Sequence, residues 1–429
     1  MPSLCFYFQI HQPIRLKREY SFFDIGNNHL YEDVSLNREI CNKVSKNCYI
    51  PATRLMIDLV EKFKGKFKIS FSITGTALEQ FQQFDPEVLE LFKELHKSGC
   101  IEFIAESYYH SLAFLFSPNE FQQQVEKHKQ TIKEIFGEEP ITFRNTELIY
   151  SNAIALEAKN MGFKNILAEG SENILGQLSS DPSGKSISGK KALSGSNATS
   201  HPLSLKLYNP KGLPDINLLL RNYKLSDDIA FRFSWKKWKK YPLTARKYVK
   251  WLSDAFSSSA EAGCDADKAI INLFMDYETL GEHHSAETGI LNFYEDLITK
   301  VINKTDIEFI MPKEVSLKHK QAEEIDVPDN TSWADEERDI SAWTGNTMQR
   351  SALNLIYKIE KKIKSLGDND LIHLWRKLQT SDHFYYMSTK RFKDGDVHKY
   401  FNYFSTPYDA YIIYCNIVND LYETIKKRV

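Results

Sequence analysis

The chain has 429 residues, which is long enough for one large α/β domain with an appended subdomain, or for two or three ordinary domains. Its 55 basic residues nearly balance its 57 acidic ones, and the net charge of -2 argues against a nucleic acid or an anionic membrane as the main partner. A hydrophobic share of 42%, with 13% aromatic residues, predicts a globular protein rather than a disordered chain.

The cysteines indicate a reducing compartment, and the N-terminus does not resemble a signal peptide. The six cysteines are scattered without a CxxC pair, which argues against both a disulfide framework and a thiolate zinc site. Residues 4–10 are apolar, but they lack a basic segment and a cleavage site, so we interpret them as a strand and not as a signal peptide. No window approaches the roughly 18 apolar residues of a membrane span. We therefore expect a soluble, cytoplasmic protein with no membrane partner.

Short β-rich runs alternate with helical patterns over the first three quarters of the chain, as is typical of βα units around a parallel sheet. The predicted strands cover 4–10, 68–74, 101–105, 141–145, 165–168, 218–222, 269–275 and 307–311. Helices are predicted from Pro51, from Pro86, and over 119–136, 152–161, 244–260 and 286–301. Seven or eight strands in this rhythm favour a closed or nearly closed (β/α) barrel over an open doubly wound sheet.

Two segments depart from this alternation. Residues 179–200 are rich in Ser and Gly and lack apolar periodicity, so they predict an exposed excursion that is either an active-site lid or a decoration. After Pro312 the pattern becomes helical, over 348–366, 370–378 and 397–427. We predict a catalytic barrel over 1–312 and a helical subdomain over 313–429 that packs on it.

Ionisable side chains follow several of the predicted strands. Catalytic groups in βα barrels project from the C-terminal ends of the strands. The residues in these positions are His11, Glu106, Arg144, Glu147, Asp276 and Glu278. Two carboxylates at different strand ends can face each other across the barrel mouth, which is the arrangement that glycoside hydrolysis needs. We select Glu147 and Asp276 as this pair, with solvated loop carboxylates as the alternative reading.

Neighbouring residues could support such a pair. Arg144 could keep Glu147 ionised through its opposite charge, or it could form a structural ion pair. Asp276 and Glu278 share one side of an extended segment, so one could act while the other orients substrate or shifts its partner's pKa. The sequence therefore predicts that charged residues surround both carboxylates.

Histidines and aromatic residues supply candidate substrate contacts. His11 and His110 could donate hydrogen bonds to sugar hydroxyls, although a structural histidine is the commoner case. Flat aromatic faces pack against pyranose rings, and among the tryptophans we select Trp343 as a sugar contact. We also include Glu106 among the substrate-binding candidates.

Metal and cofactor motifs are missing from the sequence. None of the 12 histidines lie three or four residues apart, so the helical HxxxH or HxxH pairing is absent, although His11 and His110 could still converge in space. The chain also lacks a dinucleotide fingerprint, a P-loop and a G-x-S-x-G elbow. We expect neither a metal nor another cofactor.

Four ordered motifs resemble those of the family 57 glycoside hydrolases, the α-amylase and 4-α-glucanotransferase group. The similarity covers almost the whole chain. The matching segments are His11-Gln12-Pro13, residues 99–110 through Glu106 and His110, residues 143–148 with Glu147, and residues 274–283 with Asp276. A looser fifth motif resembles residues 339–343, which end at Trp343.

The resemblance implies a distorted (β/α)7 barrel with a helical domain that completes the substrate cleft. It also implies a retaining mechanism on an α-glucan or maltooligosaccharide, with Glu147 as nucleophile and Asp276 as general acid/base. Retention requires carboxyl groups about 5 to 5.5 Å apart. The chain lacks the β-sandwich extension of some glucanotransferases, which slightly favours hydrolysis over transfer.

Three alternatives to an α-amylase remain from the sequence. A 4-α-glucanotransferase would use the same covalent intermediate, with a sugar hydroxyl in place of water. A metal-dependent carbohydrate deacetylase would need a divalent ion between His and Asp ligands. A non-catalytic glucan-binding protein is disfavoured because both Glu147 and Asp276 are present.

Overall fold

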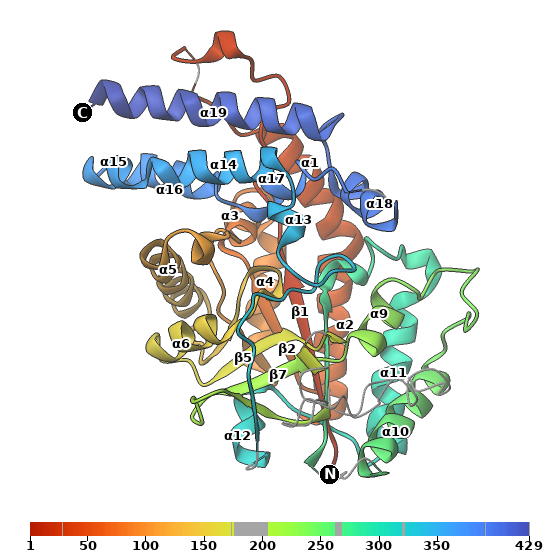
Figure 1. Ribbon diagram of the computed structural model, residues 1–429. Coiled ribbons are helices and arrows are strands. Elements are labelled where there is room, and N and C mark those ends of the chain that lie inside the picture. The colour runs from red at the N-terminus through yellow and green to blue at the C-terminus, as the bar shows by residue number, and fades with distance from the viewer. Residues whose placement is uncertain are drawn as a thin grey trace.

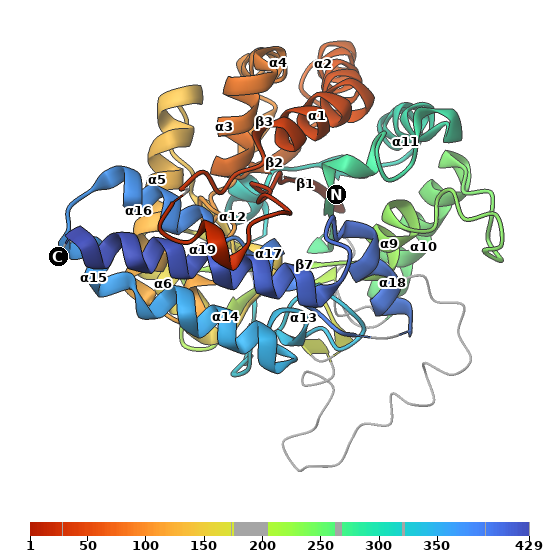
Figure 2. The same ribbon diagram turned by 90° about the horizontal axis from the view of Figure 1, so that it is seen from above.

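The computed structural model describes residues 1–27, 29–172, 174–175, 205–261, 268–319, 322–390 and 392–428. The excursion predicted over 179–200 lies outside these ranges. A sheet of mostly parallel strands stands at the centre, with helices around it (Figure 1). The C-terminal helices stack over the end of the sheet at which strand β1 finishes (Figures 1 and 2).

Seven parallel strands form a closed ring. They are β1 (Ser3–Ile10), β2 (Ile69–Ile73), β3 (Ile101–Phe103), β4 (Thr142–Arg144), β5 (Asn165–Glu169), β7 (Asn217–Arg221) and β8 (Ile270–Asp276). They pair in the order β3-β2-β1-β8-β7-β5-β4. The ring closes where Ala105, just after β3, forms a parallel bridge with Phe143. The Arg144 amide donates to the Ala105 carbonyl at 2.9 Å across this junction. The predicted (β/α)7 barrel is confirmed.

The barrel is distorted by three short strands at its base. Strand β9 (Glu308–Phe309) pairs only with the first residues of β1. Strand β6 (Tyr208–Pro210) runs antiparallel to β7, and β10 (Glu323–Ile325) pairs with β6. The incomplete pairing of β9 explains why the sequence suggested seven or eight strands. The sequence did not predict β6 and β10, and β10 extends strand pairing beyond the predicted boundary at residue 312.

Ten helices of the described residues surround the barrel. They are α1 (Val34–Val44), α2 (Ile50–Phe63), α3 (Gly75–Phe84), α4 (Pro86–Lys97), α5 (Pro118–Phe136), α6 (Asn152–Asn160), α9 (Tyr223–Ala230), α10 (Ala245–Glu261), α11 (Ile290–Lys304) and α12 (Val315–Lys318). Four of these helices were not predicted from the sequence, namely the short α12 and the longer α1, α3 and α9, which share one feature. Each begins after a polar cap, because the side chains of Asp33, Thr74 and Asn222 accept a backbone N–H of the first turn.

The C-terminal region is helical, as predicted. It contains α13 (Ser341–Thr344), α14 (Thr347–Lys358), α15 (Glu360–Ser365), α16 (Asn369–Lys377), α17 (Ser381–Tyr385), α18 (Phe392–Phe401) and α19 (Pro407–Arg428). Helices α14 and α19 pack side by side (Figure 2). Among the helices of the described residues, none is both long and apolar enough to cross a membrane.

Strand β1 is buried on both faces and anchors the centre of the molecule. Phe6 and Phe8 belong to an apolar cluster with helices α1–α4, α10 and α11, while Cys5 and Tyr7 point into the barrel interior. This two-sided burial explains the continuous apolar run in the sequence. A further cluster joins strands β4, β5 and β7 to the C-terminal helices, so the helical region shares its core with the barrel. The strand ends are therefore held on a well-packed base.

Candidate active site

The ends of strands β1, β3, β4 and β8 bring most of the predicted residues into one cluster. His11 follows β1, and Glu106 comes three residues after β3. Arg144 ends β4, and Asp276 ends β8. Contacts and charge interactions link these four residues with Glu147, His110 and Glu278. Of the predicted site residues, Trp343 alone lies elsewhere.

Glu147 occupies an unusual backbone conformation in the turn Thr146–Leu148 after β4. Its φ is 57° and that of Leu148 is 50°, in the left-handed region that residues other than glycine seldom adopt. The segment around Trp333 holds this turn, because the Trp333 amide donates a hydrogen bond to the Glu147 carbonyl at 3.2 Å. Backbone strain of this kind, about 1–3 kcal/mol per residue, persists where the surrounding structure fixes it. The turn aims the Glu147 side chain at the cluster.

The Glu147 carboxylate accepts a hydrogen bond on each oxygen. His110 Nε2 lies 3.1 Å from Oε1, and Trp333 Nε1 donates to Oε2 at 2.6 Å. Burial alone would raise the pKa of Glu147, but the bond and charge of His110, the charge of Arg144 and the Trp333 bond lower it below the ordinary value. With 22% of its side chain exposed, Glu147 is an ionised carboxylate that a ligand can reach.

Glu106 lies beneath Glu147 and is fully buried. Its Oε1 accepts from Gln9 Nε2 at 3.0 Å and from the Ser72 hydroxyl, and its Oε2 contacts His110 Nδ1 at 3.0 Å and Arg144 Nη1 at 3.5 Å. Burial would raise the pKa of Glu106, but the His110 hydrogen bond and the Arg144 charge outweigh it and bring the pKa to about 2. Glu106 therefore remains charged and anchors both cations.

His110 bridges the two carboxylates. Its Nδ1 faces Glu106 and its Nε2 faces Glu147, so both ring nitrogens must carry protons to donate. Burial would lower the pKa of His110, yet the bonds to Glu106 and Glu147 raise it to about 9. His110 is therefore an imidazolium that places a fixed positive charge against Glu147.

Asp276 has the opposite environment. It is partly exposed, and among the described residues its carboxylate has no hydrogen-bond partner. Burial, followed by the charge of Glu147, raises the pKa of Asp276 to about 6, although Arg144 and Arg221 partly offset this rise. Glu278 is 7% exposed, and burial followed by the charge of Asp276 raises its pKa to about 8. The end of β8 therefore favours protonated acids.

The structure does not support a sugar contact at Trp343. Its side chain is 1% exposed and belongs to the apolar core shared by the barrel and the C-terminal helices. Trp333 is the tryptophan at the cluster, and its ring lies between Arg144, 5.2 Å away, and Arg221, 5.7 Å away. The sequence offered no signal for this choice, because both tryptophans occur in the same polar stretch.

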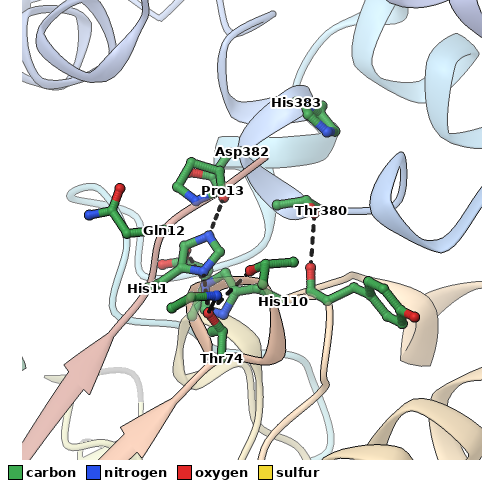
Figure 3. A network of polar contacts seen from close by, with 12 residues as sticks. His11, Gln12, Pro13, Thr74, His110, Thr380, Asp382 and His383 are labelled. Atoms are coloured by element: carbon green, nitrogen blue, oxygen red, sulfur yellow. Dashed lines mark hydrogen bonds and ion pairs between the residues drawn. The ribbon is translucent and has the colours of Figure 1, made fainter. Parts of the chain in front are cut away.

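A second residue that the sequence analysis missed is Asp382 in α17. Its Oδ2 lies 2.8 Å from His11 Nε2, while His11 Nδ1 lies 3.0 Å from the Thr74 hydroxyl (Figure 3). Burial and then the charge of His110 lower the pKa of His11. The His11 and His110 rings stack with their centroids 4.0 Å apart. Among the described residues, no group of three or more His, Cys, Asp or Glu side chains is placed to hold a metal.

A seven-stranded barrel with two carboxylates of opposed pKa shift at its strand ends is compatible with a barrel glycoside hydrolase. The model of Glycosyl hydrolase family 57 matches residues 5–328. A protein of Methanocaldococcus jannaschii named "Putative alpha-amylase" is 42% identical over 438 residues, covering 99% of this chain and 85% of that protein. The chain belongs to family 57 of the glycosyl hydrolases.

Solved structures share the fold. The 4-α-glucanotransferase of Thermococcus litoralis has a TM-score of 0.61 at 15% identity, covering 89% of this chain, which spans about 55% of that enzyme. A branching enzyme of Thermococcus kodakaraensis has a TM-score of 0.60 at 14% identity, over 93% of this chain and 88% of its own. The α-amylase of Thermotoga maritima gives 0.60 at 11% identity, over 100% and 94%. At these identities the likeness establishes the fold.

Proposed function

We propose that this glycoside hydrolase cleaves α-glucosidic bonds of α-glucans with retention, as an α-amylase does. The observation that carries the proposal is that one cluster moves the pKa values of Glu147 and Asp276 in opposite directions. Two carboxyl groups tuned apart in this way can serve as nucleophile and acid. The substrate class follows from the relatives, which are named as an α-amylase, a 4-α-glucanotransferase and a branching enzyme.

In the first half of the reaction, Glu147 attacks the anomeric carbon. A bond forms between a Glu147 oxygen and this carbon while the glycosidic carbon–oxygen bond breaks. His110 and Trp333 keep the attacking carboxylate ionised and oriented. Asp276, whose raised pKa of about 6 leaves it protonated in mildly acidic solution, gives its proton to the departing oxygen.

In the second half, Asp276 becomes the base. The ester on Glu147 carries no charge, and the charge of Glu147 is one cause of the raised pKa of Asp276. The pKa of Asp276 therefore falls once the intermediate forms, and its carboxylate can accept a proton from water. Water then attacks the anomeric carbon, Glu147 leaves as a carboxylate, and the original charges return.

The remaining predicted residues divide by exposure. Glu106 and Arg144 are fully buried, so we assign them to setting the charge of His110 and Glu147 instead of touching sugar. His11 keeps 12% of its side chain exposed, but its ring nitrogens contact Asp382 and Thr74, so we assign it to holding the site and not to donating to a sugar hydroxyl. Glu278 is 7% exposed, but it lies at the same end of the barrel as Asp276, so we keep it as a candidate to orient a bound glucan.

Two azide-rescue reactions with α-maltosyl fluoride test these roles, because fluoride leaves without a proton donor. In Glu147→Gly, azide should take the place of the nucleophile and give the β-glycosyl azide. In Asp276→Gly, the covalent intermediate still forms, so azide should give the α-glycosyl azide. The same anomer from both variants would overturn the assignment of nucleophile and acid.

A 4-α-glucanotransferase remains the second candidate, because the T. litoralis glucanotransferase shares this fold. Both reactions pass through the same intermediate and differ in whether water or a sugar hydroxyl attacks it. Incubation with maltoheptaose separates them. Shorter maltooligosaccharides alone would identify a hydrolase, whereas longer products as well would identify a transferase.

A further inference from the structure

The segment Thr380–Asp382, where α16 leads into α17, grips the backbone that carries His110. The Ser381 amide donates to the His110 carbonyl at 2.9 Å, and the Thr380 hydroxyl donates to the Tyr109 carbonyl at 3.0 Å (Figure 3). His110 has a φ of 52°, a left-handed conformation that needs such support in a non-glycine residue. The C-terminal helices thus hold the main chain of the residue that contacts Glu147.

The Asp382 side chain also acts on His110, but indirectly, because it contacts His11, whose ring stacks on His110. Burial would raise the pKa of Asp382, but its interaction with His11, which includes a hydrogen bond, and the charge of His110 lower it, so Asp382 stays ionised. As an acceptor, it fixes the proton of His11 on Nε2, at 2.8 Å. Nδ1 of His11 then accepts from the Thr74 hydroxyl at 3.0 Å, so both ring nitrogens are fixed.

The His11 ring lies flat against His110. Their centroids are 4.0 Å apart and their planes differ by 22°. His110 cannot rotate toward His11 while that ring is clamped, and its two nitrogens stay aligned with Glu106 and Glu147. A tilt of His110 would lengthen its 3.1 Å contact with the nucleophile.

We propose that Asp382 is a positioning residue, which acts through His11 to hold His110 in the orientation that presents Nε2 to Glu147. The C-terminal helices are then part of the catalytic machinery as well as a wall beside it. The kinetic consequence rests on the proposed role of Glu147 as nucleophile. Misplacement of a catalytic group by about 1 Å can cost about 100-fold in rate.

Kinetics of three variants with maltoheptaose test this inference. Asp382→Ala should lower kcat by roughly 100-fold with little change in KM. Asp382→Asn should recover part of the loss, because its amide oxygen still accepts from His11 Nε2. The matched control is Asp370→Ala, an exposed acidic residue in the first turn of α16, which should leave kcat unchanged. A raised KM at unchanged kcat in Asp382→Ala would overturn the inference and make Asp382 a substrate contact.

An NMR readout needs no substrate and stands apart from the proposed function. In histidine labelled with ¹⁵N, wild-type His11 should show the Nε2–H tautomer, and His110 should show two protonated nitrogens. Asp382→Ala should mix the His11 tautomers and speed exchange of the His110 Nε2 proton with water, while Asp370→Ala should change neither. Unchanged histidine spectra in Asp382→Ala would overturn the positioning role. If the histidine spectra change as expected but both kcat and KM stay at their wild-type values, the error lies in the role assigned to Glu147.

Discussion

The ends of strands β4 and β8 carry the same functional group in two contrasting surroundings. Beyond β4, Glu147 receives hydrogen bonds from an imidazolium and an indole, and its pKa is lowered. At the end of β8, Asp276 has no such donor among the described residues, and its pKa rises to about 6. Burial raises the pKa of both carboxylates, so the opposite directions of their pKa shifts come from where the fold places hydrogen-bond donors and cations. We therefore propose that the neighbours of each acid set its chemical role.

Removal of the β4 carboxylate should have the largest effect. Glu147→Gln keeps the shape of the side chain but cannot form a stable glycosyl ester, so kcat should fall by at least about 10⁴-fold. Initial rates on maltoheptaose measure this loss, and circular dichroism and the thermal midpoint check the fold. An unfolded variant would mean that Glu147 is a structural residue.

Removal of the cation beside Glu147 should have the next largest effect. His110→Gln loses the positive charge that opposes burial, so the pKa of Glu147 should rise. Glu147 must be ionised to attack, so the acid limb of kcat/KM should move to higher pH, and kcat should fall by about 100-fold. A pH–rate profile measures both.

His96→Gln is a matched control for that variant, because His96 pairs with Glu138 and lies outside the cluster. It should leave the acid limb in place. An unmoved limb in His110→Gln as well would show that His110 does not set the charge of Glu147.

Trp333→Phe removes one of the two hydrogen-bond donors to the Glu147 carboxylate. The variant loses the 2.6 Å bond to Glu147 Oε2 but keeps an aromatic ring between Arg144 and Arg221. A hydrogen bond to a charged group contributes about 1.5–3 kcal/mol, so kcat/KM should fall by roughly 10- to 100-fold. Trp235→Phe, at a residue 54% exposed, should have no effect. Equal losses in the two variants would remove Trp333 from the site.

The smallest effect is expected at Glu278. Wild-type activity should fall as pH rises through about 6, where Asp276 loses the proton that it must donate. Glu278, with a pKa of about 8, is neutral across that range, so Glu278→Gln should shift the alkaline limb by less than about one unit. A larger shift, seen in the pH dependence of kcat/KM, would mean that Glu278 is charged there and acts on Asp276.

The apolar runs in the sequence were sufficient to locate the ends of the barrel strands and the ionisable residues that follow them. Strand β1 is apolar on both faces, and the barrel strands that precede Glu106, Glu147 and Asp276 are short and buried, so their positions could be predicted. Trp333 and Asp382 contact the cluster from segments that are distant in the sequence. Hydrophobic periodicity describes local structure only, so it could not predict these contacts. Trp343 lies in the core, and the sequence could not show this, because an aromatic residue in a polar stretch is compatible with either core or site.

Helices that bury polar as well as apolar residues could not be predicted from apolar periodicity either. Helix α1 carries polar residues between its few buried ones, Asn37, Cys41 and Val44, so its apolar stripe is thin. Helix α9 buries Asp227 and Asp228, because Arg221 and Arg232 pair with them. These ion pairs join residues six and four positions apart in the chain, and apolar periodicity does not report them, although they allow polar residues to turn inward.

Trapping of the covalent intermediate tests the assignment of Glu147 most directly. The protein would be incubated with 5-fluoro-α-glucosyl fluoride, digested and mapped by mass spectrometry. We expect one glycosyl adduct on the peptide that contains Glu147, and none in Glu147→Gln. An adduct on the peptide that contains Asp276 would contradict the assignment.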